Sequence, residues 1–553
     1  MGLLGTVDWL FVALYFALVF GVAFWATQRE KSTRETSAGY FLAGRNVGWF
    51  VIGASLFASN IGSEHLVGLA GTGAASGVAV GQFEILASLI LLILGWVFVP
   101  FYLKSGVFTM PEFLERRYSP GARWYLAVIS IVGYVLTKIS VTIAAGGIVF
   151  EALMGIDFWT GALIVVIATG IYTVFGGLRA VLYTDMLQMF VLVGGSIVVT
   201  LLGLSAIGGW GELYETAGPS FFDMWKSTSD PSFPWTGILF GAPILGVWYW
   251  CTDQFIVQRV LSARDEENAR RGTIFGGFLK ILPLFIFVIP GVIAYGLSQK
   301  GLLELEEPDQ ALPTLIGTLL PVGLRGVVVA GLLAALMSSL SSVFNSCSTL
   351  ITWDIYRKLH PQASDKRLVW VGQISTGVLV ALGLLWIPMM ELISGQLYQY
   401  LQSVQAYISP PIAAVFLVGL LWTRVNARGA IASLATGFVL GVGRLVAELN
   451  KESLEGWLLT FAEVNFLHFA IILFVVCVLV LVGVSLTAPA PSAAQLAGLT
   501  FATREAGGAG GATGEGLSRP VVAGDARRSR RLDIGLSVVL VALVGLVWLY
   551  FTG

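Results

Sequence analysis

The sequence predicts an all-α membrane protein with about fourteen transmembrane helices, ten of which form two five-helix repeats of opposite orientation. Three observations support this prediction. The chain has 553 residues, of which 56% are hydrophobic and only 12% are charged, and its mean hydropathy is +0.83. Apolar stretches long enough to cross a bilayer follow one another with short connections. Two of these stretches also carry helix-breaking residues at corresponding places in the chain.

The spans are predicted from hydropathy, since a helix needs about 20 apolar residues to cross the hydrocarbon core. They fall at 7–26, 48–70, 79–103, 124–150, 158–175, 182–206, 235–256, 272–296, 312–352, 368–390, 393–422, 428–447, 463–487 and 533–552. The stretch 312–352 is longer than one span needs, and we expect it to begin with a short extracellular helix.

The spans group into repeats and additions. The predicted parts are an extra N-terminal helix (1–26), a first five-helix repeat (48–206), an inverted second repeat (235–422), two peripheral helices (428–487), a flexible cytoplasmic linker (488–532) and a C-terminal helix (533–553). The second repeat must be inverted because an odd number of helices separates equivalent positions. The linker is assigned from its Ala, Gly and Pro content.

Basic residues orient the chain with both termini outside. The predicted cytoplasmic loops contain 25 of the 32 lysines and arginines, as the positive-inside rule requires. These loops lie near 27–47, 104–123, 176–181, 257–271, 353–367, 423–428 and 488–532. Short loops without outer glycosylation motifs favour a plasma membrane of bacterial type, that is, the inner membrane.

Two stretches are predicted to interrupt their helices inside the membrane. The first, FASNIGS, places Gly62 beside Asn60, and the second, GAPILGVWYWCTD, contains Pro243 and Gly246. Unwound backbone at membrane depth is tolerated only around a cavity or within protein, and paired interruptions of this kind mark transporter binding sites. The alternative for FASNIGS is a glycine-rich packing helix.

Ionisable residues within the spans indicate a polar site. Glu84 and Lys280 lie well inside apolar segments, where charges are costly and mark function by default. With Asn60, His65 and Gln402 they would surround a polyhydroxylated ligand with donors and acceptors. Residues 248–250 (WYW) offer an aromatic face for a sugar ring. The alternative is an ion pair that joins two helices.

Hydroxyl groups on a second segment point to a cation. Ala335, Ser338 and Ser339 share one helical face, and Ser341 and Ser342 extend the polar stripe. With carbonyl oxygens from a broken helix, these hydroxyls form the oxygen shell that a hard cation prefers. Small-residue packing is the alternative. Two further ionisable residues have open roles: Asp185 either caps a helix or helps to hold a cation, and Lys138 is expected to have a structural partner.

Several long motifs, in order, resemble the sodium–solute symporter family, and its sodium–glucose cotransporter branch in particular. They are YFLAGR, GASLFASNIGS, HLVGLAGTGAASG, TMPEFLERRY, VFGGLRAVLYTDMLQ, WYWCTDQFIVQRVLSAR, LMSSLSSVFNSCSTL and SPPIAAVFLVGLLW, and they cover about residues 40–430. The resemblance implies the inverted-repeat fold of the sodium–leucine transporters. It also implies import of a hexose such as glucose or galactose by alternating access, with sodium as the coupling ion.

The resemblance also assigns roles to residues. The implied sugar site is Asn60, His65, Glu84, Tyr249, Trp250, Lys280 and Gln402. The implied gates are Tyr249 on the inner side and Leu69, Phe83 and Tyr398 on the outer side. The implied main sodium site is Ala58, Ile61, Ala335, Ser338 and Ser339, and a second one involves Ser59, Asp185, Ser341 and Ser342.

Two positions depart from the mammalian glucose carriers. Gly246 stands where those carriers have threonine, and Glu64 stands where they have glycine, so the hexose preference is less firmly implied than the sodium sites. Transport of another solute such as myo-inositol, and a sugar-gated sensor, therefore stay open. No nucleophile–base pair or metal-ligand cluster supports an enzyme or a cofactor other than sodium. The net charge of −1 gives no reason to expect nucleic acid, so the expected partners are sugar, sodium and the lipid bilayer.

Overall fold

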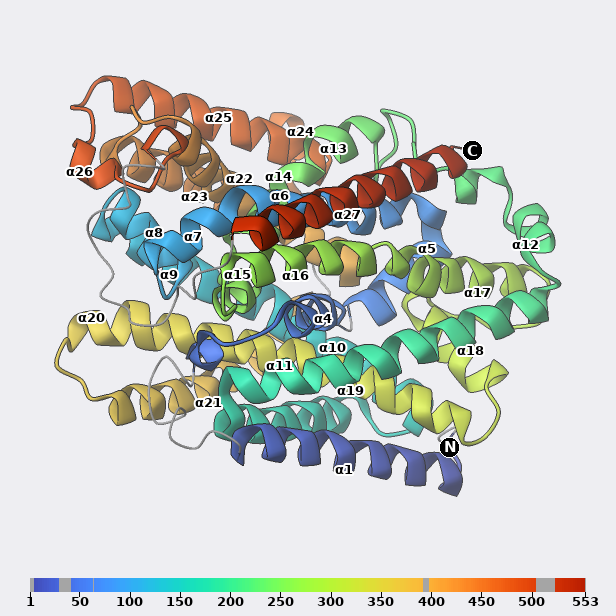
Figure 1. The fold of residues 1–553 in the computed structure, drawn as a ribbon. Coiled ribbons are helices and arrows are strands. Elements are labelled where there is room, and N and C mark those ends of the chain that lie inside the picture. Colours follow the sequence, from blue (N-terminus) through green and yellow to red (C-terminus); the bar gives the residue numbers. More distant parts are fainter. Residues whose placement is uncertain (1–3, 29–40, 63, 391–396, 504–522, 553) are drawn as a thin grey trace.

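The computed structural model describes residues 4–28, 41–62, 64–390, 397–503 and 523–552, and these are helical with connecting turns (Figure 1). Within these described ranges, eleven helices are long and apolar enough to cross a membrane. Three predicted segments are not among these eleven. Trp49–Asn60 is a shorter apolar helix, and 235–256 is divided into several pieces. The apolar stretch Phe158–Ile171 is the first part of one continuous helix, Phe158–Ile207, so the loop predicted at 176–181 is helical instead. Parts of the predicted N-terminal helix, the 27–47 loop and the 488–532 linker lie outside the described residues.

The bounds of the helices are as follows. The first half contains α1 (Thr6–Gln28), α4 (Trp49–Asn60), α5 (Ala70–Ser76), α6 (Gln82–Ile93), α7 (Val99–Ser105), α8 (Met110–Arg117), α9 (Pro120–Tyr134), α10 (Ser140–Val149), α11 (Phe158–Ile207) and α12 (Trp210–Ala217). The second half contains α13 (Trp235–Phe240), α14 (Ala242–Gly246), α15 (Gln254–Leu261), α16 (Glu266–Leu279), α17 (Ile289–Gln299), α18 (Ala311–Leu319), α19 (Leu324–Thr349), α20 (Arg357–Leu359), α21 (Asp365–Met390), α22 (Leu397–Leu421), α23 (Ala427–Leu449), α24 (Gly456–Glu463), α25 (Phe466–Leu486), α26 (Ala493–Leu496) and α27 (Ala523–Tyr550). Short π-helical segments link some of them, including η2 (Glu64–Leu69), η5 (Val135–Ile139), η8 (Val247–Thr252) and η11 (Leu350–Tyr356).

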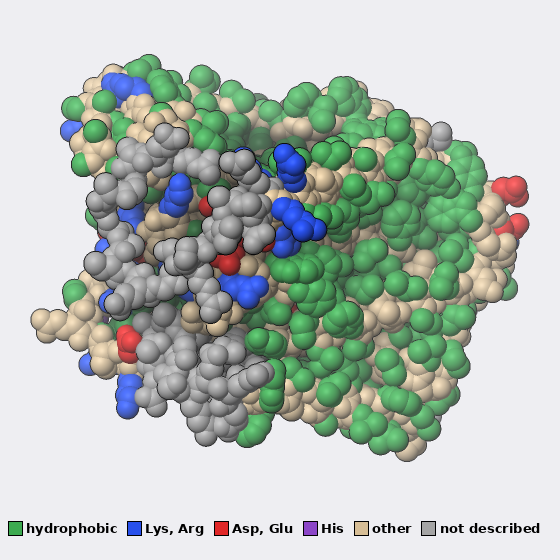
Figure 2. All heavy atoms as spheres, viewed as in Figure 1, with side chains coloured by type: hydrophobic (Ala, Val, Ile, Leu, Met, Phe, Trp, Pro, Cys, Tyr) green, Lys and Arg blue, Asp and Glu red, His purple; other side chains and the backbone are tan. Residues whose placement is uncertain are grey.

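Helix α19 lies at the centre and α1 and α27 lie at the periphery. In the most apolar window of Leu324–Leu359 94% of the residues are buried, against 17% in that of α27. Helices α1, α11 and α21 pack around α19, and α16 packs against α4. Figure 2 shows hydrophobic side chains over most of the viewed face, as expected of a surface that contacts lipid. The central position of α19 places its serine stripe inside the protein.

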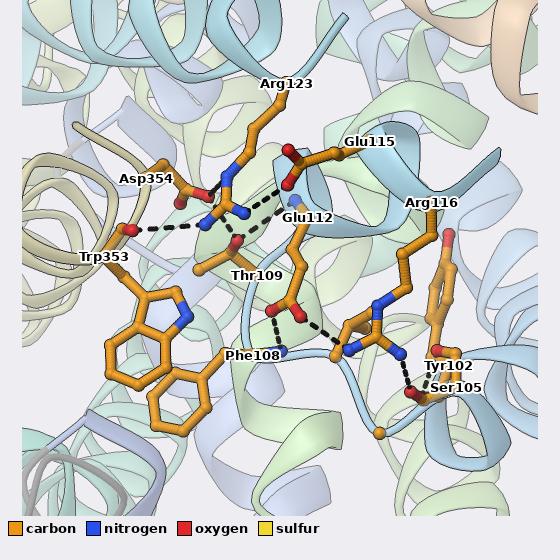
Figure 3. A network of polar contacts seen from close by, with 12 residues as sticks. Tyr102, Ser105, Phe108, Thr109, Glu112, Glu115, Arg116, Arg123, Trp353 and Asp354 are labelled. Atoms are coloured by element: carbon orange, nitrogen blue, oxygen red, sulfur yellow. Dashed lines mark hydrogen bonds and ion pairs between the residues drawn. The ribbon is translucent and has the colours of Figure 1, made fainter. Parts of the chain in front are cut away.

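A polar network fastens one end of the molecule (Figure 3). Arg123 donates to Asp354 Oδ1 at 2.7 Å and pairs with Glu115 at 2.5 Å. Thr109 donates to the same Asp354 oxygen at 2.8 Å. These contacts tie α8 and α9 to η11. Lysine and arginine side chains gather at this end of the molecule, and acidic side chains appear both among them and at the opposite end (Figure 2).

Candidate functional site

The first broken helix is interrupted at FASNIGS, as the sequence predicts. Helix α4 ends at Asn60, Ile61 takes non-helical angles (φ −76°, ψ 86°), and helical structure resumes at Glu64. The Gly62 N–H donates to the Asn60 carbonyl at 2.9 Å, so the Ala58 carbonyl loses its usual helical donor. The interruption therefore makes backbone oxygens available to a ligand in the centre of the protein.

The second interruption lies at the end of GAPILGVWYWCTD. Asp253 is extended (φ −80°, ψ 131°) between η8 and α15, and its side chain caps α15 by accepting from Phe255 N. Pro243 instead lies in the first turn of α14, where its missing N–H costs no hydrogen bond. Gly246 is helical and leaves room for Ile90, because a Cβ at this position would overlap that side chain. The sequence thus predicts the segment that is interrupted, but it places the break at Pro243 and Gly246 and not at Asp253.

A central cavity lies between the two interrupted segments and α22. The space between its lining atoms, together with its opening to solvent, amounts to about 520 Å³. Its lining is Asn60, His65, Phe83, Glu84, Leu86, Ala87, Ile90, Lys138, Ala242, Leu245, Gly246, Tyr249, Trp250, Tyr398, Leu401, Gln402 and Gln405. Six of the seven sugar-site residues expected from the sequence are in this lining. The seventh, Lys280, lies behind it.

The polar residues of the cavity bond to one another. Lys280 Nζ bonds to Asn60 Oδ1 at 2.5 Å and forms an ion pair with Glu84. His65 Nε2 is 3.1 Å from Glu84 Oε1, and Asn60 Nδ2 donates to the Tyr249 hydroxyl at 2.9 Å. Lys280 is fully buried, so it acts on the cavity through Asn60 and Glu84. These groups present hydrogen-bond acceptors and donors at membrane depth, and their charges are balanced.

Aromatic rings close the cavity on two sides. The rings of Phe83 and Tyr398 meet edge to face at 6.0 Å, and Tyr398 also contacts His65. Leu69, the third expected outer-gate residue, is buried at the end of η2, which packs against α22. On the other side lies Tyr249, with Lys138 Nζ 5.0 Å from the ring centroid. A second cavity lined by Tyr249, Lys138 and Gln405 continues beyond this ring.

The residues expected to bind the main sodium ion meet where α19 passes the first interruption. Ala58, Ile61 and Ala335 are buried, as are Ser338 and Ser339. The Ser339 hydroxyl donates to the Ser59 carbonyl at 3.2 Å, which joins α19 to the end of α4. Ser338 bonds to Asp185 instead. The atoms that these residues could offer to a cation are all oxygens, which suits a hard monovalent or divalent cation.

Of the residues expected at a second sodium site with Asp185, Ser59 bonds to this carboxylate directly. This carboxylate lies inside α11, where it accepts hydroxyl hydrogen bonds from Ser55 at 2.7 Å and Ser59 at 2.8 Å. Ser342 contacts the Ser59 hydroxyl at 3.2 Å, whereas Ser341 bonds back to its own helix. Asp185 is therefore not a helix cap, which was one of the two roles open from the sequence.

Comparison with known proteins identifies the family. The model of the sodium:solute symporter family matches residues 40–437. The chain belongs to the sodium:solute symporter family. It is a transporter and not an enzyme.

Curated relatives match the symporter over most of its length. The sodium/glucose cotransporter 4 of Danio rerio is 41% identical over 89% of this chain and 80% of its own. The sodium/glucose cotransporter 1 of Oryctolagus cuniculus is also 41% identical, over 87% and 79%. The human sodium/myo-inositol cotransporter is 39% identical over 90% and 76%.

Solved structures resemble the symporter in fold. A sodium-coupled sialic acid symporter in a substrate-bound, outward-open state gives a TM-score of 0.74 at 22% identity, over 88% of this chain and 99% of that one. The nucleobase-cation-symport-1 transporter Mhp1, in a closed conformation, gives 0.54 at 16% identity, over 82% and 96%. At these identities the likeness concerns the fold alone.

The structure brings further residues to the central cavity and to the serines around Asp185 that the sequence did not single out. Arg259 was counted among the cytoplasmic loop charges, yet it is fully buried and donates to Ser59 at 2.8 Å and Ser55 at 3.2 Å. That prediction was wrong because a basic residue after an apolar stretch resembles a loop signal. Ser55 had a detectable signal, since it lies one helical turn before Ser59. Gln405 likewise lies one turn after Gln402.

Proposed function

We propose that the symporter imports a hexose of the glucose or galactose type, driven by sodium. The observation that carries this proposal is the central cavity. It combines a charge-balanced polar wall with aromatic rings, a lining suited to the hydroxyl edge and apolar face of a sugar. The names of the cotransporters that match the chain support the same substrate class.

The sugar is proposed to lie between the two broken helices. Its contacts would be Asn60, His65, Glu84, Tyr249, Trp250 and Gln402, with Lys280 orienting Asn60 and Glu84 from behind. Trp250 is supported by the Lys280 ammonium, 5.4 Å from its ring centroid. Phe83, Tyr398 and Leu69 would form the outer gate, and Tyr249 the inner gate.

Sodium is proposed to join α19 to the first interruption. Its ligands would be the carbonyls of Ala58, Ile61 and Ala335 and the hydroxyls of Ser338 and Ser339. A second ion would use Asp185 with Ser59, Ser341 and Ser342. Because Asn60 lies in the same short segment as Ala58 and Ile61, one piece of backbone can sense both sodium and sugar.

The proposed topology follows from the same segments. Residues 48–206 and 235–422 would form inverted five-helix repeats, with fourteen membrane helices when the interrupted and short ones are included. Both termini would face outside, because the basic loops then face the cytoplasm. The protein would lie in the plasma membrane, the inner membrane if the source is bacterial.

The transport cycle uses the gates in turn. Sodium would hold the first broken helix against α19 and favour an outward-open state, the sugar would complete the cavity, and the outer gate would close. Movement of one repeat against the other, with displacement of Tyr249, would then open the inner side. Each sodium ion entering down about 100 mV contributes about 2.3 kcal/mol to this work.

Myo-inositol is a second candidate substrate. The human sodium/myo-inositol cotransporter matches this chain almost as well as the glucose cotransporters do. A cyclic polyol offers the same hydroxyl edge as a hexose, so the cavity lining fits both. Competition experiments therefore need to include it.

Uptake into proteoliposomes tests the proposal. We expect radiolabelled glucose to accumulate with an inward sodium gradient and not with potassium in its place. Sodium-dependent accumulation of radiolabelled myo-inositol but not of glucose would replace the hexose with the polyol. No sodium-dependent accumulation of either solute would contradict the proposal and favour a sensor.

A matched pair of variants links uptake to the cavity. Glu84→Gln removes the carboxylate that pairs with Lys280 and should lower sodium-driven uptake at least about tenfold, since breaking a buried pair leaves an unpaired charge. Glu151→Gln makes the same chemical change at an exposed helix end and should leave uptake unchanged. Equal sodium-driven uptake by both variants would show that transport does not depend on the Glu84 carboxylate of this cavity.

A further inference from the structure

Glu64 is a buried carboxylate that the proposed sites do not use. It begins η2, directly after the first interruption, and it has no exposed surface. Its Oε1 pairs with Lys138 Nζ, and His65 Nδ1 is 4.0 Å from the same oxygen. Its Oε2 is buried and has no hydrogen-bond partner among the described residues. An unpartnered charged oxygen at membrane depth is costly, which calls for a ligand on that side.

The free oxygen faces the main sodium site. A Cβ built on Gly62 would lie 2.3 Å from Glu64 Oε2 and 2.4 Å from the Ser339 hydroxyl, so these two oxygens are at most 4.7 Å apart, the sum of the two distances. Ser339 is one of the proposed sodium ligands, and Gly62 follows Ile61, another of them. Sodium has nearly the radius of Ca²⁺, whose oxygen ligands lie at about 2.3–2.6 Å, and one such ion can bridge two oxygens placed in this way.

We propose that Glu64 Oε2 is a further ligand of the main sodium site and that Lys138 competes with sodium for this carboxylate. The proposal rests on the sodium coupling proposed above. Without sodium, the Glu64–Lys138 pair is neutral, as is the Glu84–Lys280 pair. A sodium ion on Oε2 adds a second positive charge to one carboxylate and weakens its hold on the ammonium group.

The competition connects the ion to the inner gate. Lys138 lines the central cavity, and its Nζ lies 5.0 Å from the Tyr249 ring centroid and 5.6 Å from that of Phe255. Sodium on Glu64 would therefore weaken the hold on the Lys138 ammonium group, which lies against the ring of Tyr249. Sodium binding would thus affect the inner gate, Tyr249, through the single carboxylate of Glu64.

A purely structural ion pair would behave differently from a competing one. If Glu64 and Lys138 only join η2 to η5, removal of either partner leaves an unpaired buried charge and lowers the stability of the folded protein. Removal of both partners then restores part of that stability. If sodium and Lys138 compete, the two single variants change sodium affinity in opposite directions. The benefit of removing Lys138 then depends on Glu64.

The test is direct binding of ²²Na⁺ to purified protein without sugar. It is made at pH 8 so that Glu64 is not protonated when Lys138 is removed. We expect Glu64→Gln to raise the half-saturating sodium concentration at least tenfold. We expect Lys138→Met to lower it at least threefold. The double variant should bind as weakly as Glu64→Gln alone.

Further measurements keep the outcomes distinct. Glu64→Asp keeps the charge and should recover part of the affinity, and Glu151→Gln should match the wild type. Where Glu64→Gln does not give a monodisperse preparation, the Lys138→Met arm still decides. Suppose that the wild type binds sodium. Unchanged sodium affinity in Glu64→Gln, or weaker sodium binding in Lys138→Met, would then overturn this inference and leave the proposed function intact. Absence of sodium binding by the wild type would instead overturn the proposed function.

Discussion

Asp309 shows how a single side chain responds to burial between two helices. Its Oδ2 accepts the backbone N–H of Leu397 at 3.1 Å, and its Oδ1 has no hydrogen-bond partner among the described residues. Gly71 of α5 lies directly against it. Burial, with a smaller contribution from the nearby Glu307, raises the pKa of Asp309 to about 7. The carboxyl group thus lies between α5 and the start of α22, the helix that carries Tyr398.

The raised pKa predicts a pH-dependent stability. A carboxyl group with a folded-state pKa above its ordinary 3.8 favours the folded protein most when protonated. Its contribution is complete below about pH 4 and is lost as the pH rises through about 7. We expect Asp309→Asn to reduce the difference in melting temperature between pH 5.5 and pH 8 by about 3 °C. The exposed change Glu306→Gln is the control, and a full pH difference in Asp309→Asn would assign the effect to another group.

Helix α27 shows what an element contributes beyond its own span. Asp533 is fully buried and accepts from Arg270 at 3.0 Å and Arg271 at 2.9 Å, both in α16. Farther along the helix, Trp548 Nε1 donates to Gln82 of α6 at 2.7 Å. Since α6 carries Glu84 and α16 leads into Lys280, α27 holds together the two helices that form the buried pair of the cavity (Figure 1).

Loss of the Asp533 carboxylate should therefore weaken the fold without altering the ion site. Asp533→Asn removes two charge-assisted contacts, each typically worth about 1.5–3 kcal/mol, although Arg270 and Arg271 keep their pairs with Glu266 and Glu267. We expect a lower melting temperature in detergent and an unchanged half-saturating sodium concentration. A changed sodium affinity would show that α27 also controls the ion site.

Elements were predicted from the sequence to different degrees. The break at FASNIGS was predictable because Asn60 and Gly62 leave helical geometry easily. The extension of α27 back to Ala523 was not, because its basic first turns resemble a loop. Burial of Arg259 was not predictable either, since it depends on the serines around Asp185, which lies on a helix distant in the sequence.

At the scale of the whole molecule, the family and the helical fold could be predicted because long motifs specify them in order. The arrangement of the cavity could be predicted only in part. The sequence placed Lys280 against the sugar, whereas the structure holds it behind Asn60 and Glu84. Side-chain reach and packing decide that distinction, and neither is encoded in spacing along one helix.

The orientation of the molecule can be measured with introduced cysteines. The native Cys251, Cys347 and Cys477 are buried, so their background labelling should be low. We expect Ser229→Cys to react with a membrane-impermeant maleimide in intact cells, and Ser364→Cys to react only after permeabilisation. Both positions are exposed in the structure. The reverse pattern would invert the proposed topology.

The internal bonding of the central cavity has a consequence for turnover. Asn60 bonds to Tyr249 and His65 Nε2 to Glu84 before any sugar arrives, and His65 Nδ1 is left without a hydrogen-bond partner among the described residues. A solute hydroxyl that bonds to these paired groups must therefore exchange with an existing protein partner, and the net free energy of each exchange is small. When the solute leaves, the protein partners bond to one another again, so these groups favour its release. A carrier built in this way gives up tight binding and gains rapid release.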